Sequence, residues 1–119
     1  MHFLQIVLQI LVALGLINVW LIRSQKDTSY RGGNARNIKE EFEAYGLPSW
    51  FVMVIGILKI SIAIALLIGL FIPALVAPAA TILVMLMIGA VLMHVKVKDP
   101  IKKSLPATAM LLMSLLLLI

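Results

Sequence analysis

The sequence contains no cysteine and little charge, and each shortage excludes a class of protein. Without cysteine the chain forms no disulfide framework, no thiolate metal site and no cysteine nucleophile. Charged residues make up 13% of its 119 residues, against about 25% in a soluble globular domain, whereas hydrophobic residues make up 63%. Because so little charge does not cover a water-facing surface, the composition predicts an integral membrane protein.

Acidic residues are scarcer than basic ones, with five carboxylates against ten lysines and arginines and a formal charge of +5. In an apolar chain this basic excess is first a signal of membrane topology. The sequence shows no pattern typical of RNA- or DNA-binding proteins. We therefore expect the lipid bilayer as a partner and not nucleic acid.

Long apolar runs between the few charges predict membrane-spanning helices, since a span needs about 20 mainly apolar residues. The expected spans are residues 3–22, 49–71, 74–95 and 104–119. The last run is the shortest, about 24 Å at 1.5 Å per residue, so it crosses only if Lys102 and Lys103 extend to the interface or the membrane thins. The runs predict an all-α, integral membrane four-helix bundle forming a single domain, 1–119.

The basic residues are distributed unevenly between the two sides of this arrangement. Nine of the ten fall into the loops after the first and third expected spans: Arg23, Lys26, Arg31, Arg36, Lys39, Lys96, Lys98, Lys102 and Lys103. The positive-inside rule places both loops in the cytoplasm and both termini outside, in a cell membrane. Residues 3–22 lack a basic start and a cleavage site, so we expect a retained helix and not a signal peptide.

The first loop is the only long polar segment, and its second half predicts a short amphipathic helix over residues 35–45 on the membrane surface. Asn34 is the expected N-cap, and Gly46 suits a left-handed C-terminal cap. The apolar stripe consists of Ala35, Ile38, Phe42 and Tyr45. Residues 31–33, Arg-Gly-Gly, are either a backbone nest for an anion or a plain turn.

Small and polar side chains inside the expected spans predict close contacts between helices. Ser61, Ala65 and Gly69 recur every four residues and form a ridge that lets helix backbones approach. Gln5 and Gln9 lie one turn apart in the first span, where we expect hydrogen bonds to another helix.

Lys59 is the sharpest candidate for a functional residue. A cation in the middle of a span costs about 2.5–3.5 kcal/mol on insertion scales, and no carboxylate lies in any expected span. One interpretation is an amine that binds an anionic or carbonyl-bearing ligand. The other is a lysine that extends its ammonium toward the cytoplasmic interface. Gly56 and Ala63 share its face and favour a closely packed, inward position.

His94 is a second candidate, near the cytoplasmic end of the third expected span. It either relays protons or orients a ligand oxygen, or it is a structural histidine at the membrane edge. His2 lies at the opposite side, so a two-histidine metal or haem site is not expected. Asn18 and Trp50, at the cytoplasmic ends of the first two spans, complete the expected pocket lining.

The acidic run Glu40, Glu41 and Glu43 lies on the expected surface helix. Such a run usually forms a solvated face. Glu43 is the exception that we expect at the mouth of the bundle, because it is next to the turn into the second span.

Several short motifs follow one another along the chain: Glu41-Phe42, Tyr45-Gly46-Leu47-Pro48, a glycine in the second span, Gly89-Ala90 and His94. Their order and spacing resemble the DoxX-like family of membrane proteins over nearly the whole chain. The resemblance implies a four-helix membrane bundle, and some members are associated with quinone-linked sulfur oxidation or oxidative-stress complexes. Many members carry a carboxylate where this chain has Lys59, and a basic residue where it has Ile72-Pro73.

Two classes of function fit the sequence. The first is an accessory subunit of a redox or stress-related membrane system, with a pocket for a lipophilic ligand such as a quinone, lined by Asn18, Trp50, Lys59 and His94. No flavin, haem or iron–sulfur motif is present, so no intrinsic cofactor is expected, electrons would come from a membrane redox partner, and the chain is not expected to be an enzyme on its own. The second is a noncatalytic assembly or stability factor that holds another membrane protein. Besides the bilayer, the expected partner is a membrane redox protein or a second copy of the chain.

Overall fold

The computed structural model describes residues 2–22 and 30–119, and all regular structure in these two ranges is helical. The elements are α1 (His2–Ile17), the π-helical η1 (Asn18–Ile22), α2 (Ile38–Ala44), α3 (Ser49–Ile68), the 3-10 helix η2 (Pro73–Leu75), α4 (Val76–Lys96) and α5 (Ile101–Leu117). The all-α expectation is therefore confirmed. Arg23 and Lys26 of the first basic loop lie outside the described residues.

Three stretches of the described residues are long and apolar enough to cross a membrane. They are Phe3–Ile22, Ser49–Ile68 and Pro73–Lys96. The chain is therefore a membrane protein, as its composition predicts. The 17-residue α5 is not among these stretches, so a fourth crossing remains a prediction.

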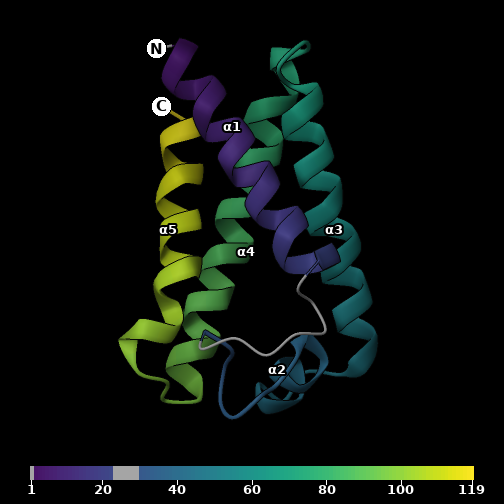
Figure 1. Cartoon of the computed structure of the whole chain (residues 1–119), viewed down its shortest axis with the longest axis vertical. Coiled ribbons are helices and arrows are strands. Elements are labelled where there is room, and N and C mark those ends of the chain that lie inside the picture. The colour runs from purple at the N-terminus through teal and green to yellow at the C-terminus, as the bar shows by residue number, and fades with distance from the viewer. Residues whose placement is uncertain (1, 23–29) are drawn as a thin grey trace.

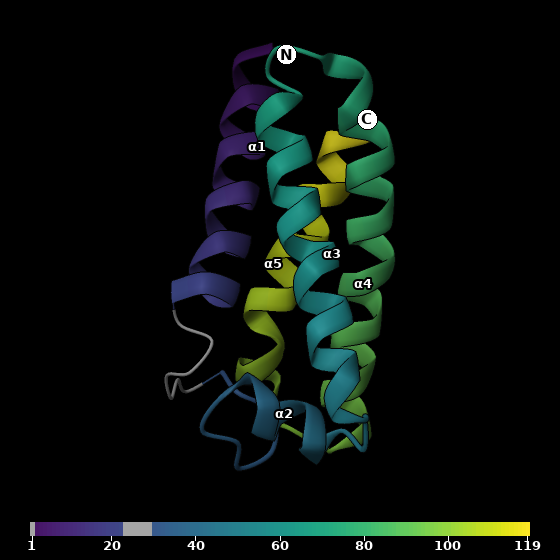
Figure 2. The same cartoon turned by 90° about the vertical axis from the view of Figure 1, so that its right-hand side faces the viewer.

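The four long helices lie side by side, and α2 lies across one end of them (Figures 1 and 2). Helix α1 packs on α3 and α5, and α4 packs on the same two helices. Both termini lie at the end opposite α2 (Figure 1). This arrangement gives the molecule two halves, one next to the termini and one next to α2.

The hydrophobic core fills the half next to the termini. Its fully buried residues include Val12 of α1, Ala63 of α3, and Ala80 and Leu83 of α4. The two alanines let the helices approach closely here. Gln9 confirms the expected interhelical hydrogen bond, because its Nε2 donates to the backbone oxygen of Leu66 at 3.0 Å.

The small-residue ridge of α3 differs from the expectation. Ser61 is exposed, and its hydroxyl donates to the backbone oxygen of Ile57 in its own helix at 2.7 Å. The fully buried residues of α3 are Ile62, Ala63 and Leu66. The other two ridge residues do pack, because Ala65 lies against the core and Gly69 is buried, where a Cβ would lie 2.9 Å from Cγ2 of Val76. The packed side of α3 buries branched side chains as well as small ones, so the spacing of small residues alone did not identify it.

Helix α2 is shorter than the predicted helix over 35–45, and its N-cap is Asn37 and not Asn34. The side chain of Asn37 accepts the N–H of Glu40 at 2.9 Å. A turn that contains Gly33 at φ +56° precedes the helix and prevents an earlier start. Gly46 follows the last turn at φ +81°, which confirms the expected left-handed cap.

Candidate functional site

A cavity of about 970 Å³ lies in the half of the molecule next to α2. Its walls come from the end of α1, η1, the α3 residues up to Lys59, the second half of α4 and the α5 residues up to Met113, with α2 at its end. Most of the lining is apolar. The polar lining residues are Asn18, Tyr30, Arg31, Glu41, Tyr45, Lys59, His94 and Lys103.

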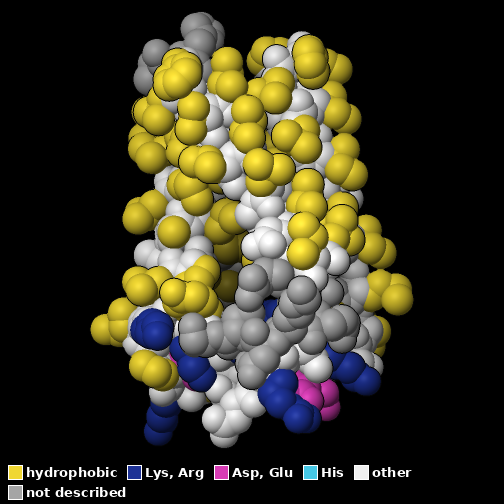
Figure 3. All heavy atoms as spheres, viewed as in Figure 1, with side chains coloured by type: hydrophobic (Ala, Val, Ile, Leu, Met, Phe, Trp, Pro, Cys, Tyr) yellow, Lys and Arg dark blue, Asp and Glu magenta, His cyan; other side chains and the backbone are white. Residues whose placement is uncertain are grey.

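The outer surface shows the same division between the two halves. Charged side chains gather at the end that carries α2, and hydrophobic side chains cover the rest of the face in Figure 3. This face is hollowed between α5 and the end of α1 (Figure 3). The π-helical segment η1 begins at Asn18 and brings both Asn18 and Trp20 to the cavity wall. Such segments are frequent at functional sites of helical proteins.

Lys59 lines the cavity from α3 and is half-buried. Its Nζ lies 5.1 Å from the centre of the Trp20 ring, within the range of a cation–π contact. Within the described ranges no carboxylate forms an ion pair with this amine. Lys59 thus lines the cavity and contacts Trp20, and its role in ligand binding is still a prediction.

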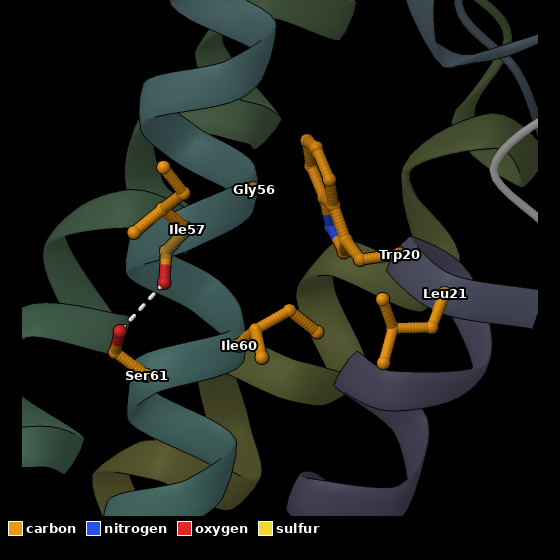
Figure 4. A pocket seen from close by; sticks show the side chains of 6 residues that line it. All are labelled: Trp20, Leu21, Gly56, Ile57, Ile60 and Ser61. Atoms are coloured by element: carbon orange, nitrogen blue, oxygen red, sulfur yellow. Dashed lines mark hydrogen bonds between the residues drawn. The ribbon is translucent and has the colours of Figure 1, made fainter.

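Trp20 reaches Lys59 because α3 has a glycine beneath the indole. A Cβ at Gly56 would lie 3.0 Å from Cε3 of Trp20, so a larger residue would displace the ring. Figure 4 shows Trp20 extending from η1 toward α3 beside a smaller groove of about 360 Å³. The other groove residues are Leu21, Gly56, Ile57, Ile60 and Ser61. This groove is almost wholly apolar, so the polar chemistry lies in the larger cavity.

Glu41 of α2 accepts the hydrogen bonds of the first part of a polar cluster. Its carboxylate accepts hydrogen bonds from Arg31 Nη1 at 3.3 Å, from the Gly32 N–H at 2.8 Å and from the Tyr45 hydroxyl at 2.9 Å. The Glu41 side chain is 13% exposed. The expectation that Glu41 belongs to a solvated face was therefore wrong.

Asp99, in the loop between α4 and α5, accepts the hydrogen bonds of the second part of this cluster. Its Oδ2 lies 2.8 Å from His94 Nδ1, and its two oxygens accept the Gly33 N–H at 3.0 and 3.3 Å. Lys103 Nζ lies 3.8 Å from Oδ1 and also donates to the backbone oxygen of Gly33. The Asp99 side chain is only 4% exposed.

The turn at residues 31–33 joins the two carboxylates, since the N–H of Gly32 binds Glu41 and that of Gly33 binds Asp99. The two amides therefore bind anions of the chain itself. Tyr45 and His94 complete the connection, with 3.5 Å between the Tyr45 hydroxyl and His94 Nε2. We call Arg31, Glu41, Tyr45, His94, Asp99 and Lys103 the polar cluster.

The phenol of Tyr45 is held in its protonated form. Burial raises the pKa of Tyr45 above its usual value, and the negative charges of Glu41 and Asp99 raise it further. At neutral pH Tyr45 is therefore a hydrogen-bond donor, and the structure directs its single proton to Glu41.

The comparisons with known proteins identify the family. A model of the DoxX-like family matches residues 29–117. The chain belongs to the DoxX-like family. No curated protein and no solved structure gave a match. The matched range of this DoxX-like protein contains the whole polar cluster and Lys59, whereas Asn18 and Trp20 precede it.

The structure brings together three of the five residues expected to bind a ligand in this DoxX-like protein. Asn18, Lys59 and His94 line the cavity, although Asn18 is itself exposed. Trp50 is 64% exposed and Glu43 is exposed, and neither lines the cavity. Trp50 lies in the first turn of α3 and Glu43 lies in α2, and the exposure of both side chains shows that neither points toward the bundle interior.

Sequence reasoning missed most of the polar cluster of this DoxX-like protein. Glu41 lies one helical turn before Tyr45, a spacing that allows a hydrogen bond but does not show which face is buried. Asp99 follows His94 by five residues, across the end of α4. A carboxylate so close to a histidine at a helix end was the available signal for this pair.

Proposed function

We propose that this DoxX-like protein is a four-helix membrane protein whose cavity binds a lipophilic ligand with a polar oxygen-bearing head, such as a quinone. In this proposal it is an accessory subunit of a redox or stress-related membrane system. One observation supports it most, the division of the cavity into long apolar walls and a polar end. An amphipathic ligand needs this division.

The apolar walls suit a flexible hydrophobic tail. The cavity volume of about 970 Å³ is near the upper limit of common ligand pockets, which run to about 1,000 Å³. Five methionines contribute to the lining: Met85, Met87, Met93, Met110 and Met113. Methionine side chains adapt to ligands of different shape because they are unbranched and polarizable.

The polar end suits a head that contains oxygen. Lys59 offers N–H donors from α3, and His94 faces the same cavity from α4. An amine inside the bundle loses hydration, and a ligand oxygen that accepts its hydrogen bond offsets that loss. The two side chains thus offer polar contacts from two walls of the cavity.

The proposal includes four crossings, with both basic loops and α2 on the cytoplasmic side. The support is the arrangement in Figures 1 and 2, where the termini and α2 lie at opposite ends of the bundle. Helix α5 has 17 residues and a length of about 26 Å, slightly short of a bilayer core. The exposed Lys102 in its first turn extends to the interface and completes the crossing.

The test replaces Lys59 by methionine and measures two quantities, thermal stability in detergent and the affinity for a short-chain quinone analogue. Lys59→Met removes the amine but keeps an unbranched side chain. We expect an unchanged or higher melting temperature and a loss of affinity of about tenfold or more, because the head loses a charge-assisted hydrogen bond. Lys39→Met, an exposed position on α2, is the matched control and should bind normally.

Unchanged affinity in a folded Lys59→Met protein would contradict the proposed role of Lys59. If no quinone analogue binds the unmodified protein and a stoichiometric membrane partner copurifies with it, the assembly-factor hypothesis is correct instead.

A further inference from the structure

The polar cluster specifies the chemical class of the ligand more closely. We infer that the cavity selects a head group with a hydroxyl donor, a quinol or another phenol, because Asp99 orients His94 as a hydrogen-bond acceptor toward the cavity. The inference rests on the proposed function and adds to it the form of the ligand that binds.

Asp99 determines which nitrogen of His94 carries the proton. Its side chain is 4% exposed, and its described neighbours all approach with donors: the Gly33 N–H, Lys103 Nζ and His94 Nδ1. A carboxylate surrounded by donors acts as an anion that only accepts hydrogen bonds. The 2.8 Å contact between Oδ2 and Nδ1 therefore requires a hydrogen on Nδ1.

The other ring nitrogen of His94 is left without a short hydrogen bond among the described residues. In the form that the inference assigns to His94, a neutral imidazole with its proton on Nδ1, the lone pair on Nε2 is free. The nearest hydroxyl, that of Tyr45, is 3.5 Å away, and its single proton goes to Glu41 at 2.9 Å. His94 is only 7% exposed and lines the cavity. Nε2 is therefore a buried acceptor whose nearest described group is the Tyr45 hydroxyl, and a ligand O–H in the cavity would complete its hydrogen bonding.

The two sides of the cavity then require different atoms from one ligand. Lys59 donates and needs a ligand acceptor, whereas His94 Nε2 accepts and needs a ligand O–H. A quinol carries both kinds of atom. A quinone carries only acceptors, and its carbonyl lone pair would oppose that of Nε2, leaving a buried acceptor unsatisfied.

The protonation state of His94 is measurable without any ligand. The chain has two histidines, so a His2→Gln variant labelled with ¹⁵N-histidine gives the signals of His94 alone. Long-range ¹H–¹⁵N correlation at neutral pH should show a protonated Nδ1 and an unprotonated Nε2. An imidazolium, or a proton on Nε2, would overturn the inference.

Asp99→Asn tests whether Asp99 positions the imidazole. The asparagine oxygen is expected to keep the Gly33 N–H and Lys103, which places its NH₂ group at His94 Nδ1. Nδ1 would then have to accept, and the proton would move to Nε2. The exposed Glu43→Gln is the matched control and should leave the tautomer unchanged. A bare Nε2 in a folded Asp99→Asn protein would contradict the positioning role.

Ligand preference is the second readout. Three short-chain probes are compared anaerobically on the unmodified protein: a quinol, the corresponding quinone and the dimethyl ether of the quinol. We expect the quinol to bind about tenfold or more tightly than the other two. Equal or tighter binding of the quinone overturns this inference but leaves the proposed function intact, whereas no binding of any probe overturns the proposed function itself.

Discussion

The hydroxyl of Tyr45 makes contacts that the position of this residue in an apolar stripe does not predict. By its spacing Tyr45 belongs to an apolar stripe, and it is indeed buried. Its hydroxyl, however, donates to Glu41 and lies beside His94. Helical periodicity identifies the buried face of a helix. It does not show which groups from distant parts of the chain form hydrogen bonds with a polar atom on that face.

The raised pKa of Tyr45 predicts that the stability of the folded protein falls at alkaline pH. The pKa of Tyr45 is raised in the folded protein, first by burial and then by Glu41, above the value of 10.0 for an unperturbed tyrosine. The folded state thus holds this proton more tightly than the unfolded state. The resulting stabilisation is fully present below pH 10 and is lost as pH rises above it.

We therefore expect Tyr45→Phe to cost about 1–3 kcal/mol at neutral pH, because Glu41 loses a donor. The variant should also lose stability less steeply than the unmodified protein above pH 10. Chemical unfolding in detergent between about pH 8 and 11 measures both effects. Tyr30→Phe, at a residue that is 42% exposed, is the control. Parallel curves for the unmodified protein and Tyr45→Phe would show that Tyr45 does not cause the alkaline loss.

The helices were predictable as elements, but their boundaries were not. Long apolar runs identified α1, α3 and α4, because the bilayer imposes length and hydropathy together. The start of α2 depends instead on the turn at residues 31–33, which is bound by Glu41 of the same segment and by Asp99 of the loop between α4 and α5. Local capping rules contain no information on such a distant contact.

The start of α2 predicts different effects for two asparagines. Asn37 caps the helix through its side chain, and Asn34 is exposed in the preceding turn. Asn37→Ala should destabilise α2 by about 1 kcal/mol, whereas Asn34→Ala should have little effect. Hydrogen exchange of the amides in residues 38–44 measures the change. Faster exchange in Asn34→Ala than in Asn37→Ala would show that Asn34 is the N-cap of α2.

At the scale of the whole molecule, the sequence predicted the membrane character and part of the candidate site. Asn18, Lys59 and His94 were identified because polar residues in apolar spans are costly and usually face the bundle interior. The polar cluster escaped prediction because it joins the first basic loop to the second, at separations such as the 66 residues between Gly33 and Asp99. Neither composition nor periodicity shows which loops meet.

The number and direction of the crossings lead to the last prediction. The chain has no cysteine, so each introduced cysteine is a unique label. With both basic loops in the cytoplasm, Asn34→Cys and Lys98→Cys should resist an impermeant thiol reagent in intact cells. Phe71→Cys, at an 85% exposed position between α3 and α4, should react.

Ile119→Cys decides whether α5 crosses. Ile119 follows α5 and is 88% exposed. If α5 crosses, Ile119→Cys reacts as Phe71→Cys does, because both lie on the side opposite α2. If α5 remains on the cytoplasmic side, Ile119→Cys is protected like Lys98→Cys, and the four-span arrangement is wrong. Reaction of all four variants after the cells are permeabilised is the control for access, and reaction of Asn34→Cys in intact cells would reverse the proposed orientation.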